Sequence, residues 1–501
     1  MGIKSFFVKP YADFVARSIK QWAASAVNHQ NECMLSIVKQ AAQTRFGIDH
    51  HFTQINDYES FKKNVPLADY EDLKPYIDKM TKGEADILWP GKPKYFAKTS
   101  GTTSGIKYIP ITKDSMPNHI NGARSAMLNY ISETGDASIF DGKMIFLSGS
   151  PELDEKGGVA TGRLSGIVNH EIPAWIKGNQ LPSYQTNCID DWEEKLEKVI
   201  DETLSADMRL ISGIPPWVQM YFERLLVRTG KKNIMEVFPN FSLFIYGGVN
   251  YEPYRAKLEE LIGKKIKSIE LFPASEGFIA FQDQQADKGM ILNTASGIFF
   301  EFVPADEVFN ENPTRLKLDQ VSLDKDYALI INSNAGLWGY NIGDLVRFAS
   351  LAPYRVIVSG RIKHYISAFG EHVIGKEVEE ALNEVGKKHQ TSVVEFTVAP
   401  QVNPLSGLPY HEWFIEFATP PQNHVAFAAD LDLAMIKQNI YYEDLIVGNI
   451  LKPLVVTSMQ KDAFRNFMKD QGKLGGQNKV PRLSNDRKIA DLLAPLKLND
   501  Y

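Results

Sequence analysis

The sequence predicts an α/β fold, in which a large N-terminal domain of layered β-sheets and helices is followed by a small C-terminal α/β domain. The chain has 501 residues, which is too many for a single hydrophobic core. Short apolar runs rich in β-branched and aromatic residues alternate with helical patterns, as in sheets covered by helices. After Gly360 a new, compact order of elements begins, of a length suited to a domain of roughly 140 residues.

The first hundred residues read as helices and a Pro-rich connection, and we expect residues 1–60 to be mainly helical. Near the N-terminus, apolar residues recur at helical spacing. They predict an amphipathic helix that packs on the body through Phe7, Tyr11, Phe14, Val15 and Ile19. No apolar run in this stretch is long enough for a signal peptide or a membrane span.

The middle of the chain supplies the strands of the large domain. Runs typical of strands are residues 143–149, 209–214, 242–248, 268–274, 297–303, 327–333 and 354–360. Amphipathic patterns at 190–204 and 251–263 predict helices between several of them.

The C-terminal part has its own order of elements. The expected helices are 374–389, 425–446 and 461–470, and the expected strands are 391–399, 410–418 and 453–459. The predicted boundaries are therefore an N-terminal domain over 1–358, a hinge over 359–363 and a small mobile domain over 364–501.

Composition excludes several functional classes. The formal net charge is -6, which is not the footprint of a nucleic-acid-binding protein. Cys33 and Cys188 are far apart, so neither a disulfide framework nor a CxxC metal site is available, and the histidines form no zinc motif. These features favour a cytoplasmic protein that binds neither nucleic acid nor membrane.

The stretch "KTSGTTSGIKYIPIT", residues 98–112, is the first candidate for chemistry. It is neither a Walker loop nor a Rossmann fingerprint, because both need a helix next, and Pro110 with its β-branched neighbours disfavours one. The loop should instead join two extended segments. Gly101 and Gly105 would let backbone N–H groups form an anion-binding nest, and Lys107 would add a charge. The alternative is a flexible surface turn.

Two further stretches place a carboxylate beside small residues or glycine. In "ELFPASEGFIAF" (270–281), Glu276 follows an apolar strand and could bind Mg²⁺; the alternative is a helix N-cap at Ser275. In "GLWGYNIGDLVRF" (336–348), Asp344 precedes a strand and could accept hydrogen bonds from a ribose diol. The alternative is an aspartate in an ordinary β-turn.

The last two stretches carry cations. "SGRIKHYISAFGEHV" (359–373) lies at the predicted domain boundary, and Arg361 and Lys363 alternate along an extended segment that could also be a polar linker. "GGQNKVPRLSND" (475–486) puts Lys479 in a Gly-rich loop, from which it could reach a phosphate or remain a solvated surface lysine.

The order and spacing of these motifs together resemble those of adenylate-forming enzymes, the superfamily of acyl-CoA ligases, luciferases and adenylation domains. The segment 61–112 narrows the match, because it resembles the auxin-responsive GH-three family of acyl acid–amido synthetases, as does the late lysine motif. The resemblance extends from about residue 55 to 490. Two positions depart from the usual pattern: Phe272 stands where Tyr is common, and Asn341 where Arg is common.

The resemblance implies ATP and Mg²⁺ as cofactors and a role for each matching residue. Glu276 would hold Mg²⁺ and, with Lys479, serve catalysis, while Lys479 would reach the α-phosphate. Gly247 would line the adenine or acyl site, and Lys363 would lie at the hinge position. The residues implied to bind the nucleotide are Ser100, Gly101, Thr102, Thr103, Ser104, Lys107, Gly248, Val249, Ala274, Ser275, Asp344 and Arg361.

The expected function is that of an ATP-dependent acyl acid–amido synthetase, acting on a small carboxylic acid and an amino acid as a monomer or dimer. Alternatives are an acyl-CoA ligase and a non-catalytic nucleotide-binding protein. Aromatic and apolar residues that could wall the acyl pocket, or equally belong to the core, are Trp217, Met220, Tyr221 and Tyr246.

Overall fold

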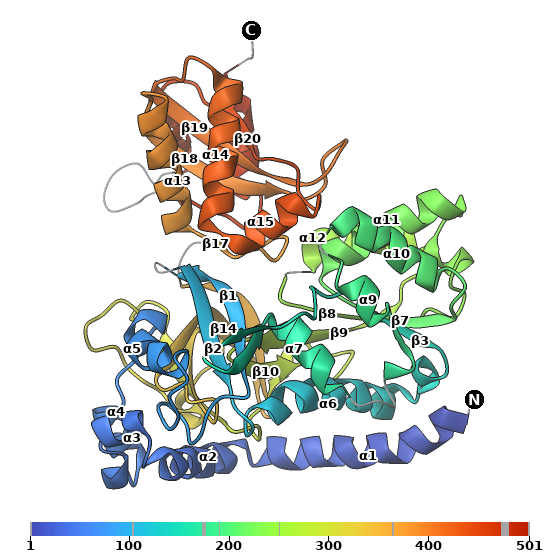
Figure 1. Ribbon diagram of the computed structural model, residues 1–501, viewed down its shortest axis with the longest axis vertical. Coiled ribbons are helices and arrows are strands. Elements are labelled where there is room, and N and C mark those ends of the chain that lie inside the picture. Colours follow the sequence, from blue (N-terminus) through green and yellow to red (C-terminus); the bar gives the residue numbers. More distant parts are fainter. Residues whose placement is uncertain are drawn as a thin grey trace. The chain divides into compact units, whose positions relative to one another are not determined.

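The computed structural model describes residues 3–102, 105–172, 177–189, 191–249, 251–362, 365–471 and 480–498 (Figure 1). The chain forms two compact units. Unit 1 consists of Met1–Thr99, Lys107–Ile189 and Lys195–Ile362, and unit 2 of Ser100–Ile106, Asp190–Glu194 and Lys363–Tyr501. The main change from one unit to the other thus falls between residues 362 and 363, inside the predicted hinge.

Unit 1 opens with helices, in the order α1 (Ile3–Ala24), α2 (Ala26–Ala41), α3 (Arg45–Asp49), α4 (Tyr58–Asn64) and α5 (Tyr70–Met80). Helix α1 lies along α6 (Met116–Thr134), and its buried face contains Ala12, Ala16 and Ile19 (Figure 1). The predicted face is wrong at two positions, because Tyr11 is 46% and Phe14 63% exposed. Small alanines occupy two of the buried positions, and the two bulky aromatic side chains lie on the exposed side of the helix.

An 11-stranded mixed sheet forms the centre of unit 1. Its parallel half has the strand order β6–β3–β7–β8–β9. Helix α6 lies on one face, and α11 (Pro215–Thr229) and α12 (Glu252–Ile262) lie on the other (Figure 1). The strands are β3 (Lys143–Phe146), β6 (Gln180–Leu181), β7 (Met208–Ser212), β8 (Leu243–Gly247) and β9 (Lys267–Ala274).

The sheet continues as an antiparallel half in the order β10–β11–β15–β14–β13–β12. These strands are β10 (Gly277–Phe281), β11 (Met290–Leu292), β12 (Ile298–Pro304), β13 (Asp326–Ser333), β14 (Tyr340–Leu351) and β15 (Tyr354–Arg361). A second sheet has the order β2–β1–β5–β4, with β1 (Tyr95–Thr102), β2 (Gly105–Ile111), β4 (Asp154–Lys156) and β5 (Val159–Gly162).

A buried ion pair ties the helical segment to the sheet. Glu301 on β12 is fully buried, and Arg315 donates to it from Nε (2.9 Å) and Nη2 (2.8 Å). The Tyr58 hydroxyl of α4 and the Asn332 amide of β13 also donate to this carboxylate, both at 2.9 Å. Burial, reinforced by Glu301, raises the pKa of the Tyr58 phenol, which therefore stays a hydrogen-bond donor.

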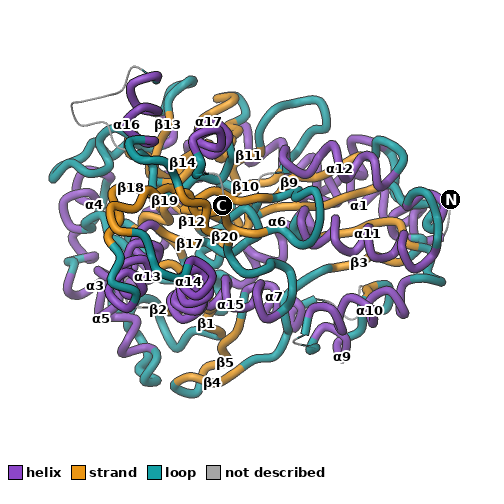
Figure 2. The backbone as a smooth tube through the Cα atoms, turned by 90° about the horizontal axis from the view of Figure 1, so that it is seen from above, coloured by secondary structure: helices purple, strands orange, loops and turns teal. Residues whose placement is uncertain are grey.

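In unit 2 the strand order is β18 (Ser392–Gln401), β19 (Tyr410–Thr419) and β20 (Val455–Ser458). Helices α13 (Gly375–Lys388) and α14 (His424–Gln438) lie on one face, and α16 (Ala463–Asp470) and α17 (Lys488–Leu493) on the other (Figure 2). Residues of β19 alternate between these faces. Phe417 packs against Phe427 of α14, whereas Phe414 joins the cluster of α16 and α17.

All the predicted strands, and the predicted helices with one exception, are confirmed with shifts of a few residues at their ends. The prediction of a single helix over 425–446 is wrong. Helix α14 ends at Gln438 and α15 (Ile440–Val447) begins after Asn439. The Asn439 Oδ1 accepts from the N–H groups of Tyr441 and Tyr442 at 3.0 and 2.9 Å, so this residue caps a new helix.

Unit 2 also buries an acid. Glu377 on α13 is 5% exposed, and its Oε2 accepts from Ile374 N (2.9 Å) and Asn439 Nδ2 (3.0 Å). Burial raises the pKa of this carboxyl from 4.5 to about 7. Between these pH values the folded unit holds a proton that the unfolded chain has lost, so this residue makes stability fall as pH rises.

Glu377→Gln is therefore expected to stabilise unit 2 at pH 8 by roughly 3 kcal/mol, since the pKa rises from 4.5 to about 7 and one pKa unit corresponds to about 1.4 kcal/mol. At pH 5, where the wild-type carboxyl is already protonated in the folded unit, the gain should largely vanish. Hydrogen exchange of the α13 amides at both pH values measures this difference. Glu384→Gln, an exposed acid on the same helix, is the control and should change neither value. A gain of equal size at pH 5 and pH 8 would contradict the assignment.

Candidate active site

The carboxyl ends of β8 and β9 meet at one edge of the parallel half-sheet, because Gly247 pairs with Leu271 in parallel register. Gly248 and Val249 follow β8, and Gly248 has a positive φ of 76° that favours glycine. At Gly247 a Cβ would overlap the carbonyl oxygen of Leu271. Open α/β sheets bind ligands at the carboxyl ends of their strands. At this edge Gly247 and Gly248 have no side chain, so a ligand could approach the backbone closely.

Ser275 and Glu276 form the two-residue connection of the hairpin between β9 and β10, in which Ala274 pairs with Gly277. The alternative of a helix N-cap at Ser275 is wrong, since residues 277–281 continue as a fully buried strand. The hairpin holds the half-buried Glu276 at the same edge as Gly248 and Val249.

Helix α6 holds this hairpin through hydrogen bonds and close packing. Asn118 Oδ1 accepts from Phe278 N at 2.6 Å, and Asn118 Nδ2 donates to Phe278 O at 3.3 Å. One turn later, a Cβ at Gly122 would overlap the Phe278 ring, so the helix rests directly on β10. Asn118 and Gly122 are positioning residues that the sequence analysis missed, although an asparagine just inside a helix start is a detectable signal.

The loop 98–112 is a hairpin, so the expectation that it joins two extended segments is confirmed. Ser100, Gly101 and Thr102 belong to β1, whereas Thr103 and Ser104 lie outside the described residues. Lys107 on β2 is half-buried, with its Nζ 5.7 Å from the centroid of the Tyr70 ring.

Asp344 lies inside β14 and is only 6% exposed, so the alternative of an ordinary β-turn is wrong. It pairs with Arg361 on β15, which brings these two predicted nucleotide-binding residues onto facing positions of adjacent strands. The neighbouring Gly343 has a φ of 87°, and Asn341 Oδ1 accepts from its N–H at 2.9 Å. Asn341 thus supports the backbone just before Asp344.

One hydrophobic cluster contains a residue from each of three motif-bearing stretches, 98–112, 270–281 and 336–348. Ile109 of β2, Phe272 of β9 and Ile342 of β14 are members of it, at 0%, 8% and 9% exposure. Phe272 and Ile342 each lie two residues before a predicted site residue, Ala274 and Asp344. The β8–β9 edge and the β14–β15 pair are separated in the sheet by β10 and β11, and the shared cluster links them.

The structure does not place the other predicted residues at the β8–β9 edge or on the β14–β15 pair. Lys363 and Lys479 lie outside the described residues. Tyr221 is fully buried with its hydroxyl 2.7 Å from Thr203 Oγ1, so this acyl-pocket candidate is a core residue. A cavity of about 790 Å³ between α1, α2, α6 and the β14–β15 turn has none of the predicted site residues in its wall.

Two absences concern only the part of the chain that the structure describes. There, no group of three or more His, Cys, Asp or Glu side chains is arranged to hold a metal ion. Within the same residues, no helix has the length and apolar character needed to cross a membrane.

Comparison with known proteins identifies relatives of this architecture. The indole-3-acetic acid-amido synthetase GH3.3 of Arabidopsis thaliana is 22% identical, over 90% of this chain and 87% of the relative. The solved structure of the AtGH3.15 acyl acid amido synthetase in complex with 2,4-DB superposes with a TM-score of 0.61 at 16% identity, covering 97% of this chain and 96% of that one.

A 2-hydroxyisobutyryl-CoA ligase in complex with 2-HIB-AMP and CoA has a TM-score of 0.51 at 13% identity, over 97% of this chain and 91% of that one. These likenesses confirm the predicted fold, a large domain of layered β-sheets and helices followed by a small α/β domain.

Sequence models of the GH3 family match three parts of the chain. They are the N-terminal domain over residues 15–185, the central domain over 291–361 and the C-terminal domain over 376–488, and together they cover more than half of it. The chain therefore belongs to the GH3 family.

Proposed function

We propose that this protein is an ATP-dependent acyl acid–amido synthetase, which activates a carboxylic acid as an acyl-adenylate and transfers the acyl group to an amino acid. The observation that carries the proposal is the edge formed by Gly248, Val249, Ala274, Ser275 and Glu276 in a member of the GH3 family. The Arabidopsis relative is named an indole-3-acetic acid-amido synthetase, which supports an amine as the acceptor.

In the first step, a carboxylate oxygen attacks the α-phosphorus of ATP and pyrophosphate leaves. The step brings two anions together, so positioning and charge stabilisation carry most of the catalysis. Backbone N–H groups of residues 100–104 and the Lys107 ammonium would bind the phosphates, and Lys479 would reach the α-phosphate. Asp344 would accept from the ribose hydroxyls, with Arg361 beside it on the paired strand.

The residues present fit a magnesium ion bound with the nucleotide. Mg²⁺ keeps several waters and takes one or two carboxylates together with substrate phosphates, so the single carboxylate of Glu276 at a strand-end turn is a suitable ligand. When bound, the ion would neutralise charge on the phosphate oxygens.

In the second step the amine attacks the acyl carbon, the bond to the AMP oxygen breaks, and AMP leaves. The acceptor needs access to the acyl carbon after pyrophosphate has gone. We propose that residues 359–363 act as a hinge about which the small domain, 364–501, turns between the two steps.

The direct test measures pyrophosphate release with ATP, Mg²⁺ and a panel of carboxylic acids, followed by mass spectrometry of products formed with amino acids. Acid-dependent release and an acyl-amino acid product are expected. The absence of acid-dependent release from an active preparation would favour a non-catalytic nucleotide-binding protein instead.

A second candidate is an acyl-CoA ligase, favoured by the fold shared with the 2-hydroxyisobutyryl-CoA ligase. Both enzymes would form the same adenylate, so the first step does not separate them. An acyl-CoA thioester as the only product, when CoA and amino acids are offered together, would establish the ligase.

Asp344→Asn is expected to raise the KM for ATP about tenfold with a smaller effect on kcat, because a charged acceptor for the ribose is lost. Steady-state kinetics at saturating acid and amine measure the change. Asp326→Asn is the matched control: it removes an aspartate on the neighbouring β13 that pairs with Arg347 near the surface. An equal rise in KM for both variants would remove Asp344 from the nucleotide site.

A further inference from the structure

The loop of residues 367–372 in unit 2 has an unusual backbone. It connects the short strands β16 (Tyr365–Ile366) and β17 (Val373–Ile374), which pair as an antiparallel hairpin. Gly370 has a φ of 94°, and His372 has a φ of 49° in the left-handed region that non-glycine residues rarely adopt. Such strain costs on the order of 1 kcal/mol or more and persists where the surroundings impose it, often at functional sites.

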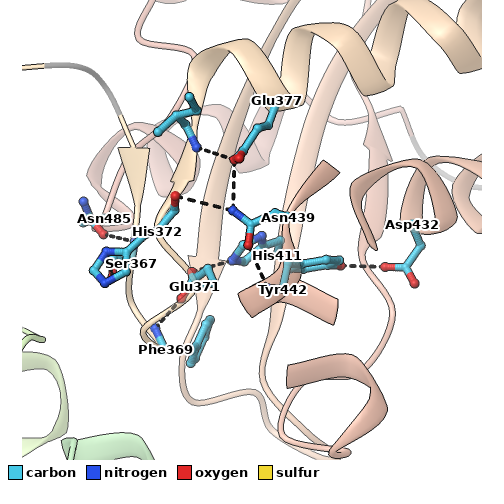
Figure 3. A network of polar contacts seen from close by, with 11 residues as sticks. Ser367, Phe369, Glu371, His372, Glu377, His411, Asp432, Asn439, Tyr442 and Asn485 are labelled. Carbon is cyan, nitrogen blue, oxygen red and sulfur yellow. Dashed lines mark hydrogen bonds and ion pairs between the residues drawn. The ribbon is translucent and has the colours of Figure 1, made fainter. Parts of the chain in front are cut away.

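A buried contact between a carboxylate and a histidine holds the loop. Glu371 is fully buried, and its Oε1 lies 2.7 Å from His411 Nε2 on β19, which is 1% exposed (Figure 3). The other carboxylate oxygen, Oε2, accepts from Phe369 N within the loop at 2.8 Å. The side chain next to His372 is thus fixed in the domain core.

Two asparagines also hold the loop. Asn485 Oδ1 accepts from Ser367 N at 2.8 Å, and Asn439 Nδ2 donates to the carbonyl oxygen of His372 at 3.5 Å (Figure 3). Asn439 Nδ2 also donates to Glu377 Oε2. Hydrogen bonds therefore hold the loop at both ends, Ser367 and His372, and in its middle at Phe369.

These contacts hold the backbone of His372 in place. The Nδ1 of the half-buried His372 lies 2.9 Å from Ser367 Oγ, and the Tyr441 ring lies 6.1 Å away and nearly perpendicular. Ser367 is 5% exposed, so its hydroxyl is itself held in place and orients the imidazole. An oriented imidazole is the side chain best suited to accept a proton near neutral pH.

The second step of the proposed reaction needs such a group, since an amino acid arrives as an ammonium ion without a lone pair. We propose that His372 is the general base of amide formation, and that Ser367, Glu371 and His411 are its positioning residues. This inference rests on the proposed function. The loop begins four residues after the proposed hinge, so it belongs to the part of the chain that the hinge would move between the two steps.

The proton balance is simple. An N–H bond of the ammonium breaks, its proton goes to Nε2 of His372, and the electron pair stays on the nitrogen. That nitrogen then bonds to the acyl carbon, the carbon–oxygen bond to AMP breaks, and AMP leaves with the electron pair. The second proton leaves from the amide nitrogen to solvent as the product forms.

His372→Asn separates this role from a structural one. Asparagine tolerates the left-handed backbone and can still bond to Ser367, but it accepts no proton. The variant should keep acid-dependent ATP–pyrophosphate exchange and lose amino-acid conjugation about 100-fold. Hydroxylamine is largely unprotonated at neutral pH and needs no base, so hydroxamate formation should stay within about twofold of wild type.

The control is His424→Asn, because His424 of α14 also lies near a serine of unit 2, with its Nδ1 3.4 Å from Ser458 Oγ. It should lower neither product. Equal losses of conjugate and hydroxamate in the His372 variant, or a wild-type conjugation rate, would overturn the inference while leaving the proposed function intact. Absence of acid-dependent exchange in the wild-type protein would overturn both.

Discussion

Glu276→Gln is expected to lower acid-dependent pyrophosphate release by about 100-fold or more, the typical loss when a preorganised charge-stabilising group is removed. Glutamine keeps the size of the side chain and the hairpin between β9 and β10, but it removes the negative charge that a magnesium ion needs. The β9–β10 pairing and the hydrogen bonds from Asn118 to Phe278 do not involve the Glu276 side chain, so the fold should persist.

The measurement is ATP–pyrophosphate exchange over a range of Mg²⁺ concentrations. We expect the Glu276 variant to need more Mg²⁺ for half-maximal rate, as well as being slow. Glu155→Gln, an exposed carboxylate on the β4–β5 hairpin, is the matched control and should behave as wild type. An unaltered metal dependence in the Glu276 variant would remove this residue from the metal site.

Arg315→Ala is expected to lower the free energy of unfolding of unit 1 by about 3 to 5 kcal/mol. The substitution leaves the fully buried Glu301 carboxylate without its cation, and it also removes the donor to the carbonyl oxygen of Val65 at 2.6 Å. Tyr58 and Asn332 would still donate to Glu301, but two neutral donors do not replace a bidentate guanidinium. Urea denaturation followed by tryptophan fluorescence measures the loss.

A similar ion pair at the surface provides the control. Arg347 contacts Asp326 through two bonds of 3.0 and 2.7 Å, with side chains 48% and 33% exposed. Because water screens this pair, Arg347→Ala should cost no more than about 1 kcal/mol. Similar losses for the two arginine variants would show that burial does not govern the energetics of these pairs.

The local parts of the fold could be predicted from the sequence because their signals are local. Pro110 and its β-branched neighbours disfavour a helix after the loop 98–112, and a strand is present there. The apolar runs at 242–248 and 268–274 predict strands, and the structure pairs these strands in parallel with Gly248 and Glu276 at one edge.

Features decided by distant contacts could not be predicted. Ser275 followed by Glu276 has the pattern of a helix N-cap, and only the pairing of residues 277–281 with β9 makes it a hairpin. Likewise, Asp344 has the pattern of a turn residue until β15 is seen opposite it. The local sequence is compatible with both the turn or cap and the strand at each of these two motifs. Pairing with a distant strand decides which of the two forms.

Buried polar groups are the second class that sequence reasoning misses. Glu301, Glu371 and His411 are almost completely inaccessible, yet a charged residue in a strand pattern normally indicates a solvent-facing position. Glu301 lies 14 residues from Arg315, and Glu371 lies 40 residues from His411, so no local pattern in the sequence predicts either pairing. The candidate base at His372 depends on such a pair and is for that reason invisible in the sequence alone.

The contact between Gly122 and Phe278 has a consequence for how this protein can change. Helix α6 touches the hairpin with no spare room, and it begins four residues after the strand that leaves the loop 98–112. Helix α6 therefore follows β2 in the chain and packs on the hairpin of Ser275 and Glu276, which is remote from it in the sequence. Because a Cβ at position 122 would overlap the Phe278 ring, any larger residue there would displace the β9–β10 hairpin from α6.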